Sequence, residues 1–226
     1  MDVVLVRHAT CAQMDDLLLG RDVDPPLDGR GECQARGLAM RLLGLPQLAL
    51  ESSPRRRARH TAGIIAATRD LPVRIVPELD EIDFGRWSGR SFEALAQDPH
   101  WRRWNQYRGA TSTPAGDSMR AVQERLLKHF CKLEQRCPAA TVVMVTHVEV
   151  IRCMALLAMQ APLDDYVRLE VRPASLTTLR VHGSARASSR SSGSSIVQAS
   201  PSVSNFSLTR ATGIALSMSS LPSPGA

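Results

Sequence analysis

The sequence has few features of an exported or membrane protein. It contains five cysteines among 226 residues and no Cys-x-x-Cys pair, which favours reduced thiols over a disulfide framework. The longest apolar stretch, Thr141–Met159, is interrupted by His147, Glu149 and Arg152, so it does not predict a membrane span. The N-terminal segment Met1–Arg7 lacks the basic start and the apolar run of a signal peptide. We therefore expect a cytoplasmic protein with no membrane partner.

Lysine and aromatic residues are also scarce. Only two of the 28 basic residues are lysine, and Phe, Trp and Tyr together make up 4% of the chain. The net charge of +6 comes from arginines spread along the whole sequence, and no aromatic residue interrupts the basic segment Ser52–Ala67. Sites for single-stranded nucleic acid combine basic with aromatic side chains. The charge therefore does not predict a nucleic-acid partner.

The composition changes sharply near residue 182. Residues 183–226 contain 15 serines in 44 positions and no acidic residue. Neither helical nor strand periodicity persists there, and the apolar run Thr212–Met218 is flanked by Ser, Pro and Gly. Such a segment buries too little apolar surface to offset its ordering entropy. We expect one domain over residues 1–182 and a disordered serine-rich tail over residues 183–226.

Short apolar runs alternate with helical patterns in the first 182 residues, which indicates the α/β class. The expected strands are Val3–Val6, Leu48–Glu51, Val73–Val76 and Val142–Val145, followed by a closing hairpin of Val167–Val171 with Leu176–Val181. The expected helices are Leu27–Leu43 with Asp28 as N-cap, Pro54–Ala66, Asp117–Glu134 with Asp117 as N-cap, and a last helix from Val148.

Basic side chains follow three of these strands. Arg7 and His8 end the first strand, and Thr146 and His147 end another that leads directly into a helix. Between them, four arginines stand within residues 55–59 at the start of a helix. Ligands of open α/β sheets bind at the carboxyl ends of the strands, and helix N-termini attract anions. The pattern predicts a phosphate site, although a single histidine at a strand end is more often structural.

Five segments, in order, resemble the histidine phosphatase superfamily, also called the phosphoglycerate mutase-like family. They are Arg7-His8-Ala9, Leu27–Ala35, Ser52–Ala62, Leu79–Gly89 and Thr146-His147, and the resemblance covers about residues 2–181. It is greatest to the small phosphatases, such as the α-ribazole and broad-specificity phosphatases. The resemblance implies a three-layer α/β/α fold with a mostly parallel central sheet and helices on both faces.

The same resemblance implies roles for individual residues. His8 would be the nucleophile that forms a phosphohistidine, while Arg7, Arg57 and His147 would bind the phosphoryl oxygens. Glu81 would carry the proton to and from the leaving group. Asp83, two residues further on, is a rival acid that the sequence cannot separate from Glu81 geometrically. The chemistry would require neither a metal ion nor another cofactor.

Further substrate contacts are expected around this centre. Cys11 stands where a hydroxyl residue is common in the family, and Trp101 and Trp104 are expected mainly to pack on a cap over the site. The complete set of expected substrate-binding residues is Thr10, Cys11, Gly20, Arg21, Thr146 and Val148.

These features predict a phosphomonoesterase acting on a small phosphorylated metabolite. Two alternatives remain open: phosphoryl transfer of the phosphoglycerate mutase type, and a non-catalytic module that binds phosphorylated ligands. The short stretch after Gly89 disfavours the mutase, which carries a longer insertion there, and the retention of both histidines disfavours the inactive module. The sequence ranks no individual substrate and does not indicate an oligomeric state.

Overall fold

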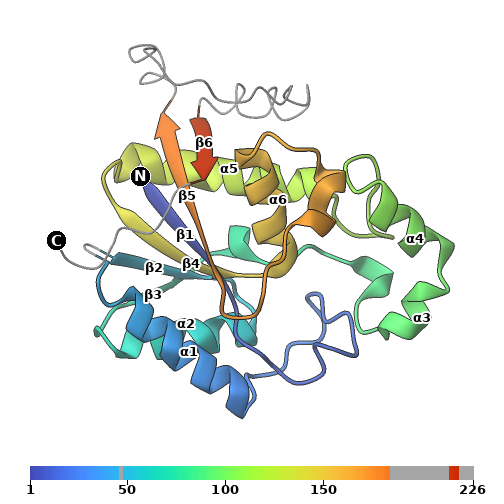
Figure 1. Cartoon of the computed structure of the whole chain (residues 1–226), viewed down its shortest axis with the longest axis horizontal. Coiled ribbons are helices and arrows are strands. Elements are labelled where there is room, and N and C mark those ends of the chain that lie inside the picture. Colours follow the sequence, from blue (N-terminus) through green and yellow to red (C-terminus); the bar gives the residue numbers. More distant parts are fainter. Residues whose placement is uncertain (46–47, 184–213, 219–226) are drawn as a thin grey trace.

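A computed structural model describes residues 1–45, 48–183 and 214–218. Its centre is a six-stranded sheet with the strand order β3-β2-β4-β1-β5-β6 (Figure 1). The neighbours from β3 to β1 pair in parallel, whereas β5 runs antiparallel to both β1 and β6. The strands are β1 (Asp2–Arg7), β2 (Leu48–Ser52), β3 (Val73–Ile75), β4 (Thr141–Thr146), β5 (Leu176–Gly183) and β6 (Ile214–Met218).

Helices cover both faces of this sheet, so the expected three-layer α/β/α arrangement is confirmed. Helices α1 (Gly29–Leu42) and α2 (Arg56–Ala67) cover one face, and α5 (Met119–Arg136) and α6 (Val148–Ala158) cover the other (Figure 1). Two shorter helices, α3 (Phe92–Ala96) and α4 (Pro99–Gln106), lie beyond the end of the sheet, between β3 and α5 in the sequence.

The alternation of side chains along the strands fixes which helices pack on which face. Along β1, Val3 and Leu5 face the core beneath α5 and α6, while Val4 and Val6 face the core beneath α1 and α2. Because both faces are covered by helices, a parallel strand of this kind must be apolar along its whole length. This explains the continuous Val and Leu run of β1.

Two sequence predictions about local structure are wrong. The N-cap of α5 is Ser118, whose hydroxyl accepts a hydrogen bond from the Ala121 N–H at 3.1 Å. The carboxylate of Asp117 instead forms an ion pair with Arg21 at 2.7 Å. The segment expected to be a strand at Val167–Val171 begins within a 3₁₀ helix, Leu163–Arg168. Strand β5 therefore pairs with β1 rather than closing a hairpin.

The sheet also includes five residues that the sequence assigned to the tail. Ile214–Met218 forms β6, which pairs with β5 in antiparallel register from Leu179 opposite Met218 to Gly183 opposite Ile214. The buried side chain of Leu216 joins the core on the α6 side. Residues 184–213 and 219–226 lie outside the described residues, so their predicted disorder stays a prediction. Within the described ranges, no helix is long and apolar enough to cross a membrane.

Candidate active site

Three neighbouring strands bring the predicted residues to one edge of the sheet. Strands β2, β4 and β1 are adjacent. Their C-terminal ends lie side by side, because Ser52 pairs with Val145 and Arg7 pairs with Thr146. Beyond the ends, the His8 N–H donates to the Thr146 carbonyl at 2.9 Å. The residues that follow the strands, which include His8 and His147, therefore meet at the carboxyl edge of the sheet.

His8 is buried and held in one tautomer. Its Nδ1 lies 2.8 Å from the carbonyl oxygen of Ala9, which can only accept a hydrogen bond, so Nδ1 carries the proton. The opposite nitrogen, Nε2, accepts a hydrogen bond from Nε of Arg57 at 3.3 Å. Burial, followed by the positive charge of Arg57, lowers the pKa of His8 well below its ordinary value. A neutral ring with a free electron pair on Nε2 is the nucleophilic form of histidine.

Arg57 is almost completely buried at the start of α2, and its guanidinium joins the two histidines. Nη2 lies 3.3 Å from Nδ1 of His147 and donates to the Gly20 carbonyl at 2.8 Å. Nη1 forms an ion pair with Asp24 at 3.2 Å. These partners hold the guanidinium in one orientation beside both histidines, and arginine is a common ligand of phosphoryl groups.

His147 is fully buried and is the N-cap residue of α6. Its Nε2 lies 2.8 Å from the hydroxyl of Ser53, and this hydroxyl lies 3.4 Å from a carboxylate oxygen of Asp80. Burial, and then Arg57 and His8, lower the pKa of His147 well below its ordinary value. The two imidazole rings meet edge to face, with centroids 5.2 Å apart.

Of the two candidate acids, Glu81 faces the site and Asp83 does not. Glu81 is 5% exposed and one of its carboxylate oxygens lies 4.0 Å from Nδ1 of His147. Burial, together with the negative charge of Glu149, raises the pKa of Glu81 to about 7. The side chain of Asp83 is 39% exposed and accepts the backbone N–H of Gly85 at 2.8 Å.

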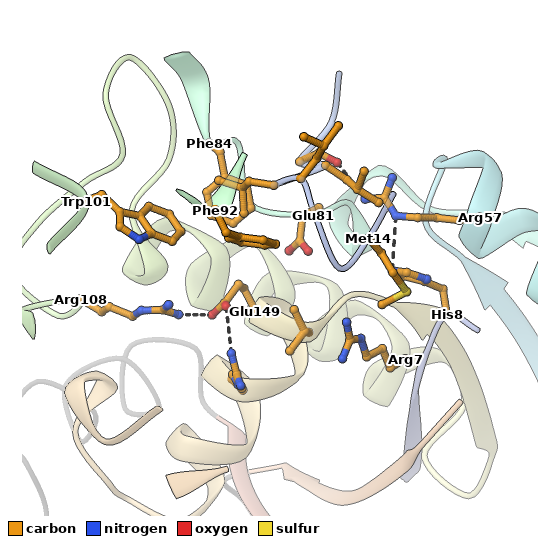
Figure 2. Close-up of a pocket in the computed structure, with 16 residues that line it drawn as sticks. Arg7, His8, Met14, Arg57, Glu81, Phe84, Phe92, Trp101, Arg108 and Glu149 are labelled. Atoms are coloured by element: carbon orange, nitrogen blue, oxygen red, sulfur yellow. Dashed lines mark hydrogen bonds and ion pairs between the residues drawn. The ribbon is translucent and has the colours of Figure 1, made fainter. Parts of the chain in front are cut away.

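His8, Arg57 and Glu81 line a cavity of about 290 Å³, whereas the fully buried His147 lies outside its lining. Arg7, His8 and Arg57 lie toward one end of the cavity, and Glu81 lies between them and Trp101 (Figure 2). Nη1 of Arg7 donates to the Val171 carbonyl at 2.6 Å, while its buried Nε has no partner. The structure thus brings an imidazole of lowered pKa, two arginines and a carboxyl group of raised pKa into one cavity. That set of groups can bind a phosphoryl group and transfer a proton to the oxygen of its leaving group.

The expected substrate-binding residues divide into two groups. Gly20 and Val148 line the cavity. The other four lie outside its lining, and their polar groups are used within the protein or buried. Thr10 donates to Gln34 at 2.7 Å, Thr146 donates to the Leu79 carbonyl at 2.6 Å, and Arg21 bonds Asp117 and the Glu81 carbonyl. The thiol of Cys11 is buried, which raises its pKa to about 11.

Sequence reasoning missed the other end of the cavity. Phe92, Arg108, Glu149 and Arg152 line it, and Trp101, expected mainly to pack, both packs on Trp104 and faces the cavity. Glu149 could have been found from the sequence, since it is an acidic residue in the first turn of a helix that is apolar apart from Arg152 and that follows His147 directly. Phe92 and Arg108 could not, because they lie in the connection between β3 and α5.

The histidines do not belong to a metal-binding group. Within residues 1–45, 48–183 and 214–218, no three His, Cys, Asp or Glu side chains are arranged to hold a metal ion. Nε2 of His8 and Nδ1 of His147 both lie 3.3 Å from a nitrogen of the Arg57 guanidinium, a cationic group. The donor set is therefore suited to an anion, and the predicted independence from metal and cofactor remains a prediction.

Comparisons with known proteins agree with this geometry. An adenosylcobalamin/alpha-ribazole phosphatase of Escherichia coli is 32% identical over 151 residues, which cover 65% of this chain and 73% of the relative. Phosphoserine phosphatase 1 of Hydrogenobacter thermophilus is 32% identical over 157 residues, which cover 67% of this chain and 73% of that protein.

Solved structures share the fold. YhfR of Bacillus stearothermophilus superposes with a TM-score of 0.74 at 26% identity, and the match covers 80% of this chain and 92% of the YhfR chain. A mycobacterial glucosyl-3-phosphoglycerate phosphatase in complex with VO3 gives a TM-score of 0.72 at 25% identity, with coverages of 80% and 93%. The family model of the histidine phosphatase superfamily (branch 1) matches residues 3–192. The chain therefore belongs to the histidine phosphatase superfamily, branch 1, and is a phosphatase.

Proposed function

We propose that this chain is a metal-independent phosphomonoesterase that hydrolyses a small phosphorylated metabolite through a phosphohistidine on Nε2 of His8. One observation carries the proposal: Nδ1 of His8 lies 2.8 Å from the Ala9 carbonyl. Because that bond keeps the proton on Nδ1, Nε2 holds an electron pair that can attack once it no longer accepts the hydrogen bond from Arg57. The names of the two relatives, both phosphatases of small molecules, support the substrate class.

The first step transfers the phosphoryl group to the enzyme. Nε2 of His8 attacks phosphorus in line, and a P–N bond forms while the P–O bond to the leaving alcohol breaks. Arg7 and Arg57 stabilise the charge on the three non-bridging oxygens. Protonated Glu81 gives its proton to the departing oxygen, so the product leaves as a neutral alcohol.

The second step regenerates the enzyme. Glu81, now a carboxylate, takes a proton from a water molecule that attacks phosphorus, the P–N bond breaks, and inorganic phosphate leaves. A single carboxyl group must therefore be protonated in one step and ionised in the next. A pKa of about 7 for Glu81 suits both roles near neutral pH.

His147 would complete the phosphoryl site, and Ser53 allows it to do so. Nδ1 of His147 must carry a proton to donate to a phosphoryl oxygen. The Ser53 hydroxyl, 2.8 Å from Nε2, can either accept from that nitrogen or donate to it. The ring can thus change tautomer when phosphate binds without leaving a buried nitrogen unpaired.

The test measures hydrolysis of p-nitrophenyl phosphate in EDTA by the wild type and by His8→Ala, with acid and base quenching of the reaction. We expect metal-independent turnover and a phosphoenzyme that is labile in acid, both abolished in His8→Ala. A folded wild type that neither turns over nor traps phosphate would refute the proposal. Net transfer between phosphoglycerate and bisphosphoglycerate in place of hydrolysis would instead support the mutase alternative.

A further inference from the structure

The cavity has a second end that the phosphoryl chemistry does not use. Arg7, His8 and Arg57 lie at one end, and Trp101 and Arg108 lie at the other (Figure 2). In-line attack by His8 places the leaving group on the side of phosphorus opposite Nε2. The alcohol part of the substrate must then extend past Glu81 toward Trp101, so the side chains there determine which phosphomonoesters are accepted.

One wall of this end is aromatic and exposed. Trp101 is held by Trp104, stacked with centroids 5.4 Å apart, and by Trp87, perpendicular at 5.2 Å. Phe92 is 39% exposed although it is a large apolar side chain, and it faces the same cavity. Apolar surface concentrated in a pocket usually marks a ligand contact. Because its neighbours fix Trp101, this wall is already arranged to receive a flat apolar group.

The rest of this end is charged, and its two guanidinium groups share a single carboxylate. Arg108 lies between the rings of Trp104 and Tyr166, 3.9 and 3.3 Å from their centroids, and forms an ion pair with Glu149. Arg152 donates to the other carboxylate oxygen of Glu149 at 3.1 Å. Both arginines at this end, among the described residues, are therefore bound to one carboxylate.

This pairing disfavours a substrate with a second anionic group. A carboxylate on the alcohol would lie beside Glu149 and would have to compete with it for Arg108 and Arg152. Separating a buried carboxylate from its partners costs more than a surface ion pair returns. A neutral group meets no such penalty and gains the contact with Trp101 and Phe92.

We propose that the substrate is a phosphomonoester whose alcohol carries a flat aromatic group and no second anionic group, with Trp101 and Phe92 as the residues that recognise the ring. The inference rests on the proposed phosphomonoesterase function. It excludes phosphorylated hydroxy acids and amino acids such as 3-phosphoglycerate and phosphoserine as preferred substrates.

The test compares benzyl phosphate, glycerol 1-phosphate and O-phosphoserine, which all release a primary alcohol. Their P–O bonds are similar in reactivity, so differences in kcat/KM report recognition of the leaving group. We expect kcat/KM for benzyl phosphate to exceed that for glycerol 1-phosphate by about 10-fold, with phosphoserine lower again. Turnover of phosphoserine equal to or faster than that of benzyl phosphate would overturn the proposal.

Two variants locate the recognition. We expect Phe92→Ala and Trp101→Ala each to lower the ratio of benzyl to glycerol phosphate turnover by about 10-fold. Tyr107→Ala is the matched control, since Tyr107 is 47% exposed, follows the same helix α4 and does not line the cavity. Phe92 lies at the surface, so its variant keeps the test valid even if Trp101→Ala misfolds. An unchanged ratio in Phe92→Ala would contradict the assignment.

The outcomes separate this inference from the proposed function. If a folded enzyme hydrolyses neither p-nitrophenyl phosphate nor any of the three esters, the phosphomonoesterase proposal itself fails; if it hydrolyses p-nitrophenyl phosphate but not benzyl phosphate, only the inference about the substrate fails. If all three are hydrolysed without preference for the aromatic ester, only the inference about the substrate fails. Inhibition by benzylphosphonate, compared with methylphosphonate, adds a readout that does not depend on turnover, and equal inhibition by the two would likewise contradict the inference.

Discussion

The carboxylate of Asp24 holds the outer edge of the Arg57 guanidinium, with Oδ1 3.2 Å from Nη1. Its other oxygen accepts the backbone N–H of Arg56 at 2.7 Å, in the first turn of α2. The carbonyls of Gly20 and Val23 accept from the same guanidinium. The loop between β1 and α1 therefore positions an arginine that α2 supplies, and Asp24 links the two segments.

Loss of the Asp24 charge should loosen Arg57 without removing it. We expect Asp24→Asn to lower kcat/KM by about 10-fold, with the larger share in KM, because misplaced donors weaken phosphate binding in both ground and transition states. Steady-state kinetics with p-nitrophenyl phosphate measures this. Asp22→Asn, an exposed position in the same loop, is the matched control and should behave as wild type. Equal kinetics for the two variants would contradict the positioning role.

Removal of the Ser53 hydroxyl should leave Nε2 of His147 without a partner in a fully buried site. We expect Ser53→Ala to lower kcat/KM by about 10- to 100-fold, because Nε2 of His147 then has no hydrogen-bond partner in either tautomer. Ser52→Ala is the control, since the Ser52 hydroxyl donates only to the Ser53 carbonyl. Nitrogen-15 chemical shifts of His147 should change in Ser53→Ala alone. Identical shifts in wild type and Ser53→Ala would refute this explanation.

The raised pKa of Glu81 gives a pH dependence whose sign follows from its proposed role. The protonated form acts in the first step, so kcat/KM for an alkyl phosphate should be constant below about pH 7 and fall above it. His8 stays neutral across this range because burial keeps its pKa well below its ordinary value. A p-nitrophenyl ester, whose leaving group needs no proton, should lack the fall above pH 7.

Two variants test the choice between the acids. Glu81→Gln should reduce kcat/KM for the alkyl ester by about 100-fold or more and for the p-nitrophenyl ester far less. Asp83→Asn should change kcat/KM little for either ester, since the Asp83 carboxylate accepts the Gly85 N–H and lies near Arg21. A large loss specific to the alkyl ester in Asp83→Asn, with Glu81→Gln unaffected, would reverse the assignment.

The sheet and the helices that pack on it were predictable because they depend on local patterns. The apolar run of β1 predicts a strand buried on both faces, and Asp28 predicts the start of α1, where it accepts the Gly31 N–H at 2.6 Å. Asp117 was wrongly predicted as the N-cap of α5, because its carboxylate pairs with Arg21, far away in the sequence, and with Arg125 of α5 itself. Strand β6 pairs with β5 only after a long intervening segment, a contact that no local pattern encodes.

The end of the cavity that holds Arg7, His8 and Arg57 was also predictable, because the positions of the strand ends and the spacing of the motifs both indicated it. His8, His147 and Arg57 stand next to one another as expected. The contacts that tune them were not predictable, because Ser53 and Asp24 act through single hydrogen bonds across the fold. The positions of Phe92 and Trp101 at the other end depend on how helices α3 and α4 pack. Helices this short do not determine their own packing, so the sequence did not predict these positions.

The first turn of α1 packs so closely on the chain after His8 that only glycine fits at residue 31. A Cβ built on Gly31 would lie 1.9 Å from the carbonyl oxygen of Thr10. That carbonyl also accepts the Asp28 N–H at 3.3 Å, so the segment cannot move away without losing a hydrogen bond. We expect Gly31→Ala to lower the free energy of unfolding by about 2 kcal/mol, despite the higher helix propensity of alanine.

Gly37 supplies a control in the same helix, because a Cβ there meets no atom within 4 Å. Gly37→Ala should raise the free energy of unfolding by about 0.5–1 kcal/mol, the ordinary gain for an exposed helical site. Urea denaturation of both variants measures the difference. Since Thr10 lies two residues after His8, Gly31→Ala should also lower kcat/KM, whereas Gly37→Ala should not. Equal free energies of unfolding for the two variants would show that α1 can move away from Thr10. If Gly31→Ala also kept the kcat/KM of the wild type, the contact between Gly31 and Thr10 would not position His8.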